Sequence, residues 1–392
     1  MTRQLSTDLI HHPYQPPAGF AAPQPGVFKA STVLFKDVAA LRSRDWRSRQ
    51  GYTYGLHGTP TTMLLEERIA TLEGGRQCLL APSGLAAVAL VDLALLGPGD
   101  EVLLPANVYG PSRELARNEL ARWGISHRLY DPVDAAALQA CLTPATKLVW
   151  LEAPGSVTME FPDLAALARV ARERGVLTAL DNTWGAGLAL RGFEHGIDIV
   201  MQALTKYPSG GGDVLMGSVT TADLALHERI KGTHMRLGLG VAGNDAEMVL
   251  RSLPTMALRY AAQDQTARQL AGWLQTQPQV ARVLHPALPG SPGHDHWARH
   301  CTQAAGIFSV LLQPRYTQAQ VDRFVDALQL FGIGYSWAGP MSLAVPYDLG
   351  GMRAAGHGLR GHLVRFSIGL EAVADLKADL EQALASALGA AA

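Results

Sequence analysis

The 392-residue sequence predicts an α/β protein with a mostly parallel sheet, a second and smaller C-terminal α/β domain, and an extended N-terminal arm. From residue 76 onward, short apolar runs alternate with helical segments of roughly 10–15 residues, a pattern typical of a parallel sheet covered on both faces. Hydrophobic residues make up 48% of the chain and charged residues 17%, as in ordinary globular proteins. The length is sufficient for two domains.

Charge and cysteine content exclude several classes of function. The net charge of −1 gives no reason to expect a nucleic-acid or anionic-membrane partner. Three scattered cysteines, Cys78, Cys141 and Cys301, are too few for a disulfide framework or a zinc site. No signal-peptide pattern opens the sequence, and no apolar run approaches the roughly 20 residues of a membrane span. We therefore expect a soluble, cytoplasmic protein.

The first 50 residues do not resemble part of a core. Residues 11–26 contain five prolines, which favour an extended path with few backbone donors. We expect this arm to be either disordered or laid over a neighbouring surface. A loop rich in glycine and hydroxyl side chains follows at residues 51–62, and it leads into a helix over 63–72 for which Thr61 or Thr62 is a plausible cap.

The sheet domain is predicted from six apolar runs and the helices between them. The expected strands are residues 77–81, 101–105, 126–130, 147–152, 176–180 and 198–202. The expected helices are 84–96, 111–123 and 163–174. Ligands of such sheets bind beyond the carboxyl ends of the strands, so the loops that follow the strands are the candidate site.

Lys206 follows an apolar run at residues 197–201 and precedes a glycine-rich turn. Burial at a strand end lowers the pKa of an amine, and a neutral amine is a nucleophile toward aldehydes. The glycines permit close approach of backbone or a bound group. By itself the stretch slightly favours the plainer interpretation, a surface lysine just past a strand end with glycines in an ordinary turn.

Three other strand ends carry unusual residues. The helix that begins near Gly84 has a free N-terminus, which is either a phosphate seat or a plain turn. Tyr109 could stack on a planar ligand or pack in the core. Asp181 could cap a turn or pair with a protonated ring nitrogen.

The character of the sequence changes after about residue 240. Helical segments at 245–253 and 260–275 precede a strand at 306–313, a helix at 317–330 and a strand at 363–370. Arg365 lies within that last alternating pattern, where a buried cation needs an anionic partner. A guanidinium is suited to binding a carboxylate through two hydrogen bonds.

Two further patterns carry little weight. Residues 238–243 match the dinucleotide pattern G-x-G-x-x-G, but no buried strand precedes them. His294, His296 and His300 could share a helix face, yet a zinc site needs three or four ligands, and a solvated helix start is the better interpretation. The chain also lacks the serine-hydrolase and P-loop motifs.

Six ordered motifs together resemble the Cys/Met-metabolism family of pyridoxal-phosphate enzymes, which has the aminotransferase type I fold. They are Leu72-Glu-Gly-Gly75, Pro82-Ser-Gly84, Leu151-Glu-Ala-Pro-Gly-Ser-Val-Thr-Met-Glu160, Asp181-Asn-Thr-Trp-Gly-Ala-Gly187, Ala203-Leu-Thr-Lys-Tyr207 and Tyr335-Ser-Trp337. The resemblance spans residues 52 to about 373. It implies a seven-stranded sheet, an arm over residues 1–55 that contacts a neighbouring subunit, a cofactor domain over 56–240 and a C-terminal domain over 241–392.

The resemblance implies roles for the cofactor site. Lys206 would hold pyridoxal 5'-phosphate covalently and, once freed, shuttle protons. Asp181 would pair with the pyridine nitrogen, while Tyr109 would stack on the ring and assist proton transfer. The remaining cofactor contacts would come from Gly84, Leu85, Thr183 and Thr205.

It also implies the substrate site and the assembly. Arg365 would bind the substrate α-carboxylate, with Ser336 and Trp337 lining the same pocket. Tyr54 would enter the neighbouring subunit's site, so a homodimer would be the catalytic unit, within a tetramer as is common in the family.

The Gly-Ser at 155–156 and Tyr335-Ser-Trp337 resemble the β-lyase branch of the family. The implied activity is a C–S β-lyase that cleaves L-cystathionine, or a related cysteine S-conjugate, to a thiol, pyruvate and ammonia. The alternative is a γ-lyase, γ-synthase or O-acylhomoserine sulfhydrylase of the same family. The implied partners are a small amino-acid thioether and a second copy of the chain, with no metal.

Two departures from the family pattern stand out. Leu56 occupies the place of an arginine that contacts the partner subunit's phosphate, and His57 is the candidate substitute, although it could merely support the loop. Gly210–Gly212 replaces the usual Gly-His-Ser, which removes a side-chain hydrogen bond near the site.

Overall fold

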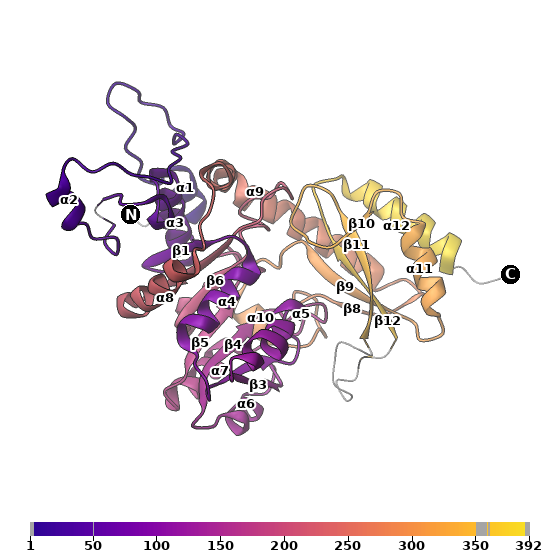
Figure 1. The fold of residues 1–392 in the computed structure, drawn as a ribbon. Helices are drawn as coiled ribbons and strands as arrows, with labels where there is room; N and C mark the ends of the chain where they lie inside the picture. The colour runs from indigo at the N-terminus through magenta and orange to yellow at the C-terminus, as the bar shows by residue number, and fades with distance from the viewer. Residues whose placement is uncertain (1–3, 50, 350–358, 360, 389–392) are drawn as a thin grey trace.

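The computed structural model describes residues 4–49, 51–349, 359 and 361–388. Residues 1–3 and 50 of the predicted arm, and 350–358, 360 and 389–392 of the predicted C-terminal domain, lie outside the described residues. Figure 1 shows a larger sheet with its helices, a second sheet beside it, and the N-terminal segment at the far end. None of the described helices is both long and apolar enough to cross a membrane.

The larger sheet has seven strands in the order β1-β7-β6-β5-β4-β2-β3. Every pairing between β6 and β3 is parallel, whereas β7 runs antiparallel to both β1 and β6. The predicted mostly parallel sheet is therefore confirmed. Its strands are β1 Gln77–Ala81, β2 Glu101–Pro105, β3 Ser126–Tyr130, β4 Thr146–Glu152, β5 Leu177–Asp181, β6 Ile199–Gln202 and β7 Gly217–Thr221.

Helices bury both faces of this sheet. Leu79 packs in one hydrophobic cluster, and its neighbour Leu80 packs in another on the opposite face. This alternation explains why strands such as β2 and β6 are largely continuous apolar runs. The helices of this region are α3 Pro60–Glu73, α4 Gly84–Leu95, α5 Gly110–Leu115, a π-helical turn Ala116–Leu120, α6 Ala135–Cys141, α7 Leu164–Glu173 and α8 Leu224–Leu237.

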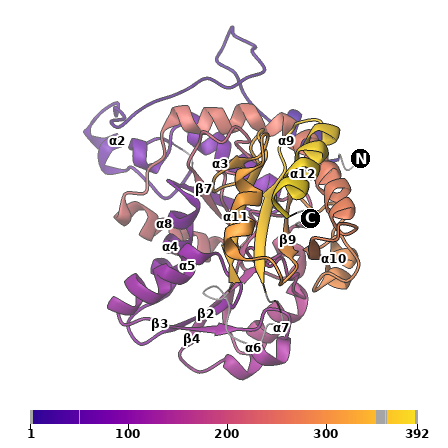
Figure 2. The same ribbon diagram turned by 90° about the vertical axis from the view of Figure 1, so that its right-hand side faces the viewer.

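The second sheet has five strands in the order β10-β11-β12-β9-β8. Figure 2 shows α11 and α12 side by side across this sheet, where they bury a separate hydrophobic cluster. The strands are β8 Val280–Leu284, β9 Ile307–Leu312, β10 Gly332–Ile333, β11 Leu343–Asp348 and β12 His362–Ser367. The helices are α9 Gly243–Leu274, α10 His294–His300, α11 Gln318–Asp326 and α12 Val373–Leu388.

Two local predictions are wrong. The segments 245–253 and 260–275 belong to one helix, α9, which continues through Pro254. Leu253 and Met256 on either side of the proline are fully buried, so packing outweighs the lost hydrogen bond. The cap of α3 is Thr59 and not Thr61 or Thr62, because its side chain accepts a hydrogen bond from the Thr62 backbone.

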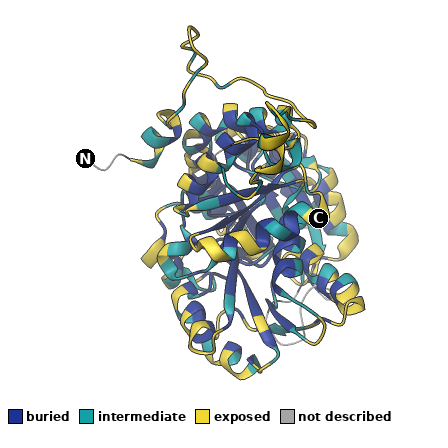
Figure 3. Cartoon of the chain, turned by 60° about the vertical axis from the view of Figure 1, so that its left-hand side comes forward, coloured by how far each residue is buried: buried dark blue, intermediate teal, exposed yellow. Residues whose placement is uncertain are grey.

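The N-terminal segment is only partly extended. It contains two short helices, α1 Leu5–Ile10 and α2 Val38–Arg42, and Leu9 of α1 is buried in the main hydrophobic cluster. The prediction that no residue of the arm joins the core is therefore wrong at Leu9. Residues 17–36 are mostly exposed, and Figure 3 shows this stretch as a largely yellow excursion from the rest of the chain.

Candidate active site

Lys206 lies in the turn that follows β6, where its carbonyl accepts a hydrogen bond from Gly210. Its Nζ donates to the Ser336 hydroxyl at 2.6 Å, which joins this turn to the C-terminal region. Burial, and then the nearby Arg365 charge, lower the pKa of Lys206 to about 8. A fraction of this amine is therefore neutral near pH 7, as nucleophilic attack requires.

Asp181 ends β5, the neighbour of β6 in the sheet. One carboxylate oxygen, Oδ1, accepts from the Thr183 backbone at 3.0 Å and from the Thr183 hydroxyl at 2.5 Å. The same hydroxyl accepts from the Ala203 N–H at 2.9 Å, so Thr183 ties the loops after β5 and β6 together. Among the described residues, no side chain or backbone donor reaches the second oxygen of Asp181, which is left for a ligand. Asp181 thus caps a turn and could also bind a ring nitrogen.

Tyr109 is 44% exposed, so it does not pack in the core. Its backbone N–H donates to Glu152 at 2.7 Å, and the Ser156 hydroxyl donates to the other oxygen of Glu152 at 2.7 Å. Glu152 pairs with Asp181 in the β4–β5 register, and burial and this neighbour raise its pKa. No sequence pattern singled out Glu152. The available signal was an acidic residue at the carboxyl end of an apolar strand.

The N-terminus of α4 lies beside the loop after β6. The Ser83 hydroxyl accepts a hydrogen bond from the Ala86 N–H, and the Ser83 carbonyl accepts one from the Ala87 N–H. The Gly84 and Leu85 N–H groups have no acceptor among the described residues. A Cβ on Gly84 would lie 2.8 Å from the Ala203 Cβ, so only glycine fits there. These free donors suit an anion.

The Thr205 hydroxyl is already engaged. It donates to the Met216 carbonyl at 3.2 Å and accepts from the Met216 N–H at 3.0 Å. A donated bond from Thr205 to a phosphate therefore requires the hydroxyl to rotate away from that carbonyl.

Arg365 on β12 faces the same space as Lys206, whose pKa it lowers. Its Nη2 donates to the Ser336 carbonyl at 3.4 Å, whereas its Nε is shielded from solvent and has no partner among the described residues. Trp337 lies beneath the lysine, with Nζ 5.7 Å from its ring centre. The structure thus brings Arg365, Ser336 and Trp337 to Lys206.

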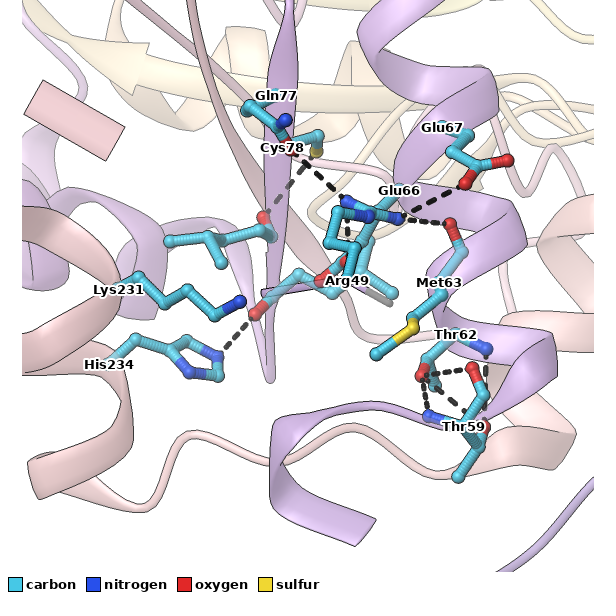
Figure 4. Close-up of polar contacts among 12 residues, drawn as sticks. Arg49, Thr59, Thr62, Met63, Glu66, Glu67, Gln77, Cys78, Lys231 and His234 are labelled. Atoms are coloured by element: carbon cyan, nitrogen blue, oxygen red, sulfur yellow. Dashed lines mark hydrogen bonds and ion pairs between the residues drawn. The ribbon is translucent and has the colours of Figure 1, made fainter. Parts of the chain in front are cut away.

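Tyr54 and His57 form no hydrogen bond or ring contact with this group among the described residues. Tyr54 precedes the short helical turn Gly55–His57, which His57 ends, and their ring centres are 5.9 Å apart. The His57 Nδ1 is 2.7 Å from the Thr53 hydroxyl. His57 lines a pocket together with Lys231 and His234. Figure 4 shows Lys231 and His234 near Arg49 and Glu66.

The discounted patterns lie in connections or on helices. Gly238 ends α8 and Gly243 begins α9, so the glycine pattern at 238–243 joins two helices and follows no strand. The three histidines lie on α10, where His294 is 2.9 Å from the Pro286 carbonyl. Within the described ranges, no cluster of three histidine, cysteine or acidic residues is arranged to hold a metal ion.

The sequence model of the Cys/Met metabolism PLP-dependent enzymes matches residues 6–385. The chain belongs to this family. Cystathionine beta-lyase from Bordetella avium is 40% identical over 96% of the chain and 96% of its own length. Cystathionine beta-lyase from Salmonella typhimurium is 36% identical over 96% of the chain and 97% of its own length. The crystal structure of cystathionine gamma-lyase from Lactobacillus plantarum with L-serine superposes with a TM-score of 0.89 at 29% identity, covering 98% of this chain and 100% of that one.

The residues present fit the cofactor of this family. An aldehyde requires an amine, which Lys206 supplies with a lowered pKa. A pyridine nitrogen requires an acceptor, and a phosphate requires free donors, which Asp181 and the Gly84 and Leu85 N–H groups provide. The half-exposed Tyr109 ring offers a stacking surface.

Gly210 retains the glycine of the usual Gly-His-Ser, and the departures from that pattern lie at Gly211 and Gly212. Gly210 has φ +65°, and a Cβ there would lie 1.9 Å from Nη1 of Arg259. The Arg259 side chain thus occupies the space beside the turn, and this guanidinium donates to the Ser252 hydroxyl at 2.7 Å. The positive φ favours glycine at 210.

Proposed function

We propose that the protein is a pyridoxal-phosphate-dependent C–S β-lyase that cleaves L-cystathionine, or a related cysteine S-conjugate, to a thiol, pyruvate and ammonia. The observation that carries the proposal is the convergence of Lys206, Asp181 and Arg365, with Ser336 bonded to the lysine. The curated relatives named cystathionine beta-lyase, which match nearly the whole chain, support the β-lyase branch.

The cofactor would be held by residues that end or follow four strands, β1, β2, β5 and β6. Lys206 would bond to its aldehyde carbon, Asp181 would accept from its ring nitrogen with the help of Thr183, and Tyr109 would stack on its ring. The Gly84 and Leu85 N–H groups, with Thr205, would bind its phosphate. When bound, pyridoxal phosphate supplies an electron sink for the electron pair that remains as the substrate Cα loses its proton.

The chain's own groups bind the substrate and move the proton. Arg365 binds the α-carboxylate through its free donors, and this contact orients the Cα–H bond toward Lys206. The Lys206 amine, when free, would take the Cα proton, because a pKa of about 8 leaves it partly neutral near pH 7. Ser336 holds Nζ near the reacting carbon, with the Trp337 ring below it. The same lysine then protonates the leaving sulfur.

We infer that a second copy completes the site. Tyr54 and His57 lie away from Lys206 within their own chain, and the exposed apolar side chains of residues 17–36 favour cover by a neighbour. A homodimer is then the catalytic unit, with residues 1–55 as its contacting arm, 56–240 as the cofactor domain and 241–392 as the C-terminal domain. His57 takes the role of the missing arginine toward the partner's phosphate.

Product analysis tests the proposal. The cofactor-loaded enzyme is incubated with L-cystathionine, and the keto acid and thiol are identified. Pyruvate with homocysteine is expected. α-Ketobutyrate with cysteine would move the protein to the γ-lyase class, and product formation only with a second thiol or homoserine ester would make it a transferase.

A further inference from the structure

Arg365 is a largely buried cation that no described acidic side chain pairs with. Burial lowers its pKa, and the groups that act against this effect are the hydroxyls of Tyr347, Tyr335 and Tyr109. A buried guanidinium ordinarily requires an anionic partner or a full set of hydrogen bonds. Its one hydrogen bond within the described residues goes to the Ser336 carbonyl at 3.4 Å. Something other than a carboxylate must therefore hold the guanidinium in place.

The ring of Tyr347 lies against this guanidinium. The Arg365 Cζ is 5.4 Å from the ring centre, within the range of a cation–π contact. The two residues come from neighbouring antiparallel strands, in which Arg365 faces Val345 and Tyr347 faces Leu363. Tyr347 is thus the diagonal neighbour of Arg365 on the same face of the sheet, a distance that aromatic and long side chains span.

An aromatic ring stabilises a guanidinium in a way that a carboxylate cannot. The ring engages the flat face of the cation, whereas a carboxylate would occupy the N–H groups at its edge. Those edge donors are the groups that an amino-acid carboxylate needs. The unpartnered Nε shows that at least one of them is still free.

We propose that Tyr347 is a positioning residue that fixes the plane of the Arg365 guanidinium for the substrate α-carboxylate. This inference rests on the proposed role of Arg365. It assigns to β11 a part in substrate binding through the carboxylate alone, and not through the leaving thiol.

The test compares two ligands that differ only in the carboxylate. Cofactor-loaded enzyme is titrated with L-alanine and with ethylamine, and the dissociation constants are taken from the absorbance change of the bound cofactor. Tyr347→Leu is expected to weaken L-alanine binding about fivefold, since a cation–π contact of this kind contributes roughly 1 kcal/mol. Ethylamine binding should stay unchanged. Tyr347→Phe, which keeps the ring, should bind both ligands as the wild type does.

The second arm uses Arg365→Leu as a background. There, Tyr347→Leu should produce no additional loss of L-alanine affinity, because the group that it positions is absent. Equal weakening of both ligands, an undiminished effect in the Arg365→Leu background, or a fivefold loss in Tyr347→Phe would each overturn the proposal. If Arg365→Leu alone leaves L-alanine binding unchanged, the carboxylate role of Arg365 fails, and the inference about Tyr347 fails with it. The lyase assignment is tested separately, because L-alanine carries no leaving group.

Discussion

Two buried clusters of charged residues differ in how completely the chain itself satisfies them. One lies at the candidate active site around Lys206 and Arg365. The other lies between β1, α3 and α8, and Figure 4 shows its members Arg49, Glu66 and Lys231. Both contain largely buried cations, and burial lowers the pKa of the lysine in each.

The second cluster is internally paired. Arg49 forms an ion pair with Glu66 at 3.1 Å and donates to the Met63 carbonyl at 2.7 Å. Lys231 donates to the Arg47 carbonyl at 2.8 Å. Most donors here thus have acceptors in the same chain, as expected of groups that hold an arm to a domain.

The cluster around Lys206 and Arg365 is not internally paired. Lys206 has one hydroxyl partner, the Arg365 Nε has none among the described residues, and burial raises the pKa of Asp181. Leaving such groups unsatisfied costs stability, and a folded protein tolerates this cost where a ligand completes the set. The charged groups of the second cluster thus stabilise the folded chain, whereas those of the active-site cluster remain free to bind a ligand.

The largest expected effect is that of Lys206→Ala. We expect turnover of L-cystathionine to fall by roughly 10⁴-fold or more, as for other groups that act directly on the reacting atoms. The variant should also lose the absorbance band near roughly 420 nm that is expected for lysine-bound pyridoxal. Thermal unfolding of the cofactor-free variant should occur at the wild-type temperature or higher, because a poorly solvated amine has been removed. A marked loss of stability would place Lys206 with the structural cluster instead.

Arg49→Ala should show the opposite behaviour. Removing one partner leaves Glu66 buried without its cation, and we expect a loss of about 2 kcal/mol in the free energy of unfolding, below the range for fully buried pairs because Arg49 is partly exposed. Urea denaturation of the cofactor-free protein measures this loss. Turnover per cofactor-loaded site should remain within about twofold of the wild type, since a structural pair contributes nothing to the transition state.

The double variant Arg49→Met with Glu66→Gln is the matched control. It removes both charges of the Arg49–Glu66 pair and should recover much of the lost stability, because Glu66 no longer carries a charge that has lost Arg49. A loss of turnover in Arg49→Ala without a loss of stability would contradict the division between the two clusters.

The sequence predicted the strands of the fold only in part. Strands β1, β2 and β3 have the predicted bounds; β1 and β2 are buried on both faces, and such runs are continuous and apolar. The strand β7, Gly217–Thr221, was missed because its serine and threonines give no apolar run. The strand β11 was missed as well, since Pro346 argues against a strand interior.

The site shows the same limit. Lys206, Asp181 and Arg365 could be selected because each follows, ends or lies within a recognisable strand. Tyr347 and Glu152 could not, because their importance depends on register across strands that are far apart in the sequence. Local patterns predict where a strand is, whereas long-range pairing decides which side chains meet.

The pH dependence of cofactor binding provides the finest test of the comparison. The pKa of Lys206 is lowered from the ordinary 10.5 to about 8, first by burial and then by Arg365. Only the neutral amine attacks the aldehyde, so the rate at which cofactor-free enzyme combines with pyridoxal phosphate should rise about tenfold per pH unit below the pKa and level off above it. Stopped-flow absorbance between about pH 7 and 9 avoids the second ionisation of the phosphate near pH 6.

The sign of the linked stability change follows from the same shift. Because the folded pKa lies below the unfolded one, the unfolded chain binds more protons between about pH 8 and 10.5, and the Lys206 contribution to stability rises with pH across that window. Arg365→Leu removes a neighbouring positive charge, so the midpoint of the rate profile should move to higher pH. Arg49→Ala lies in the other cluster and should leave the midpoint where it is. A wild-type midpoint close to 10.5 would mean that Lys206 is solvated like a surface lysine, and the distinction between the two clusters would not hold.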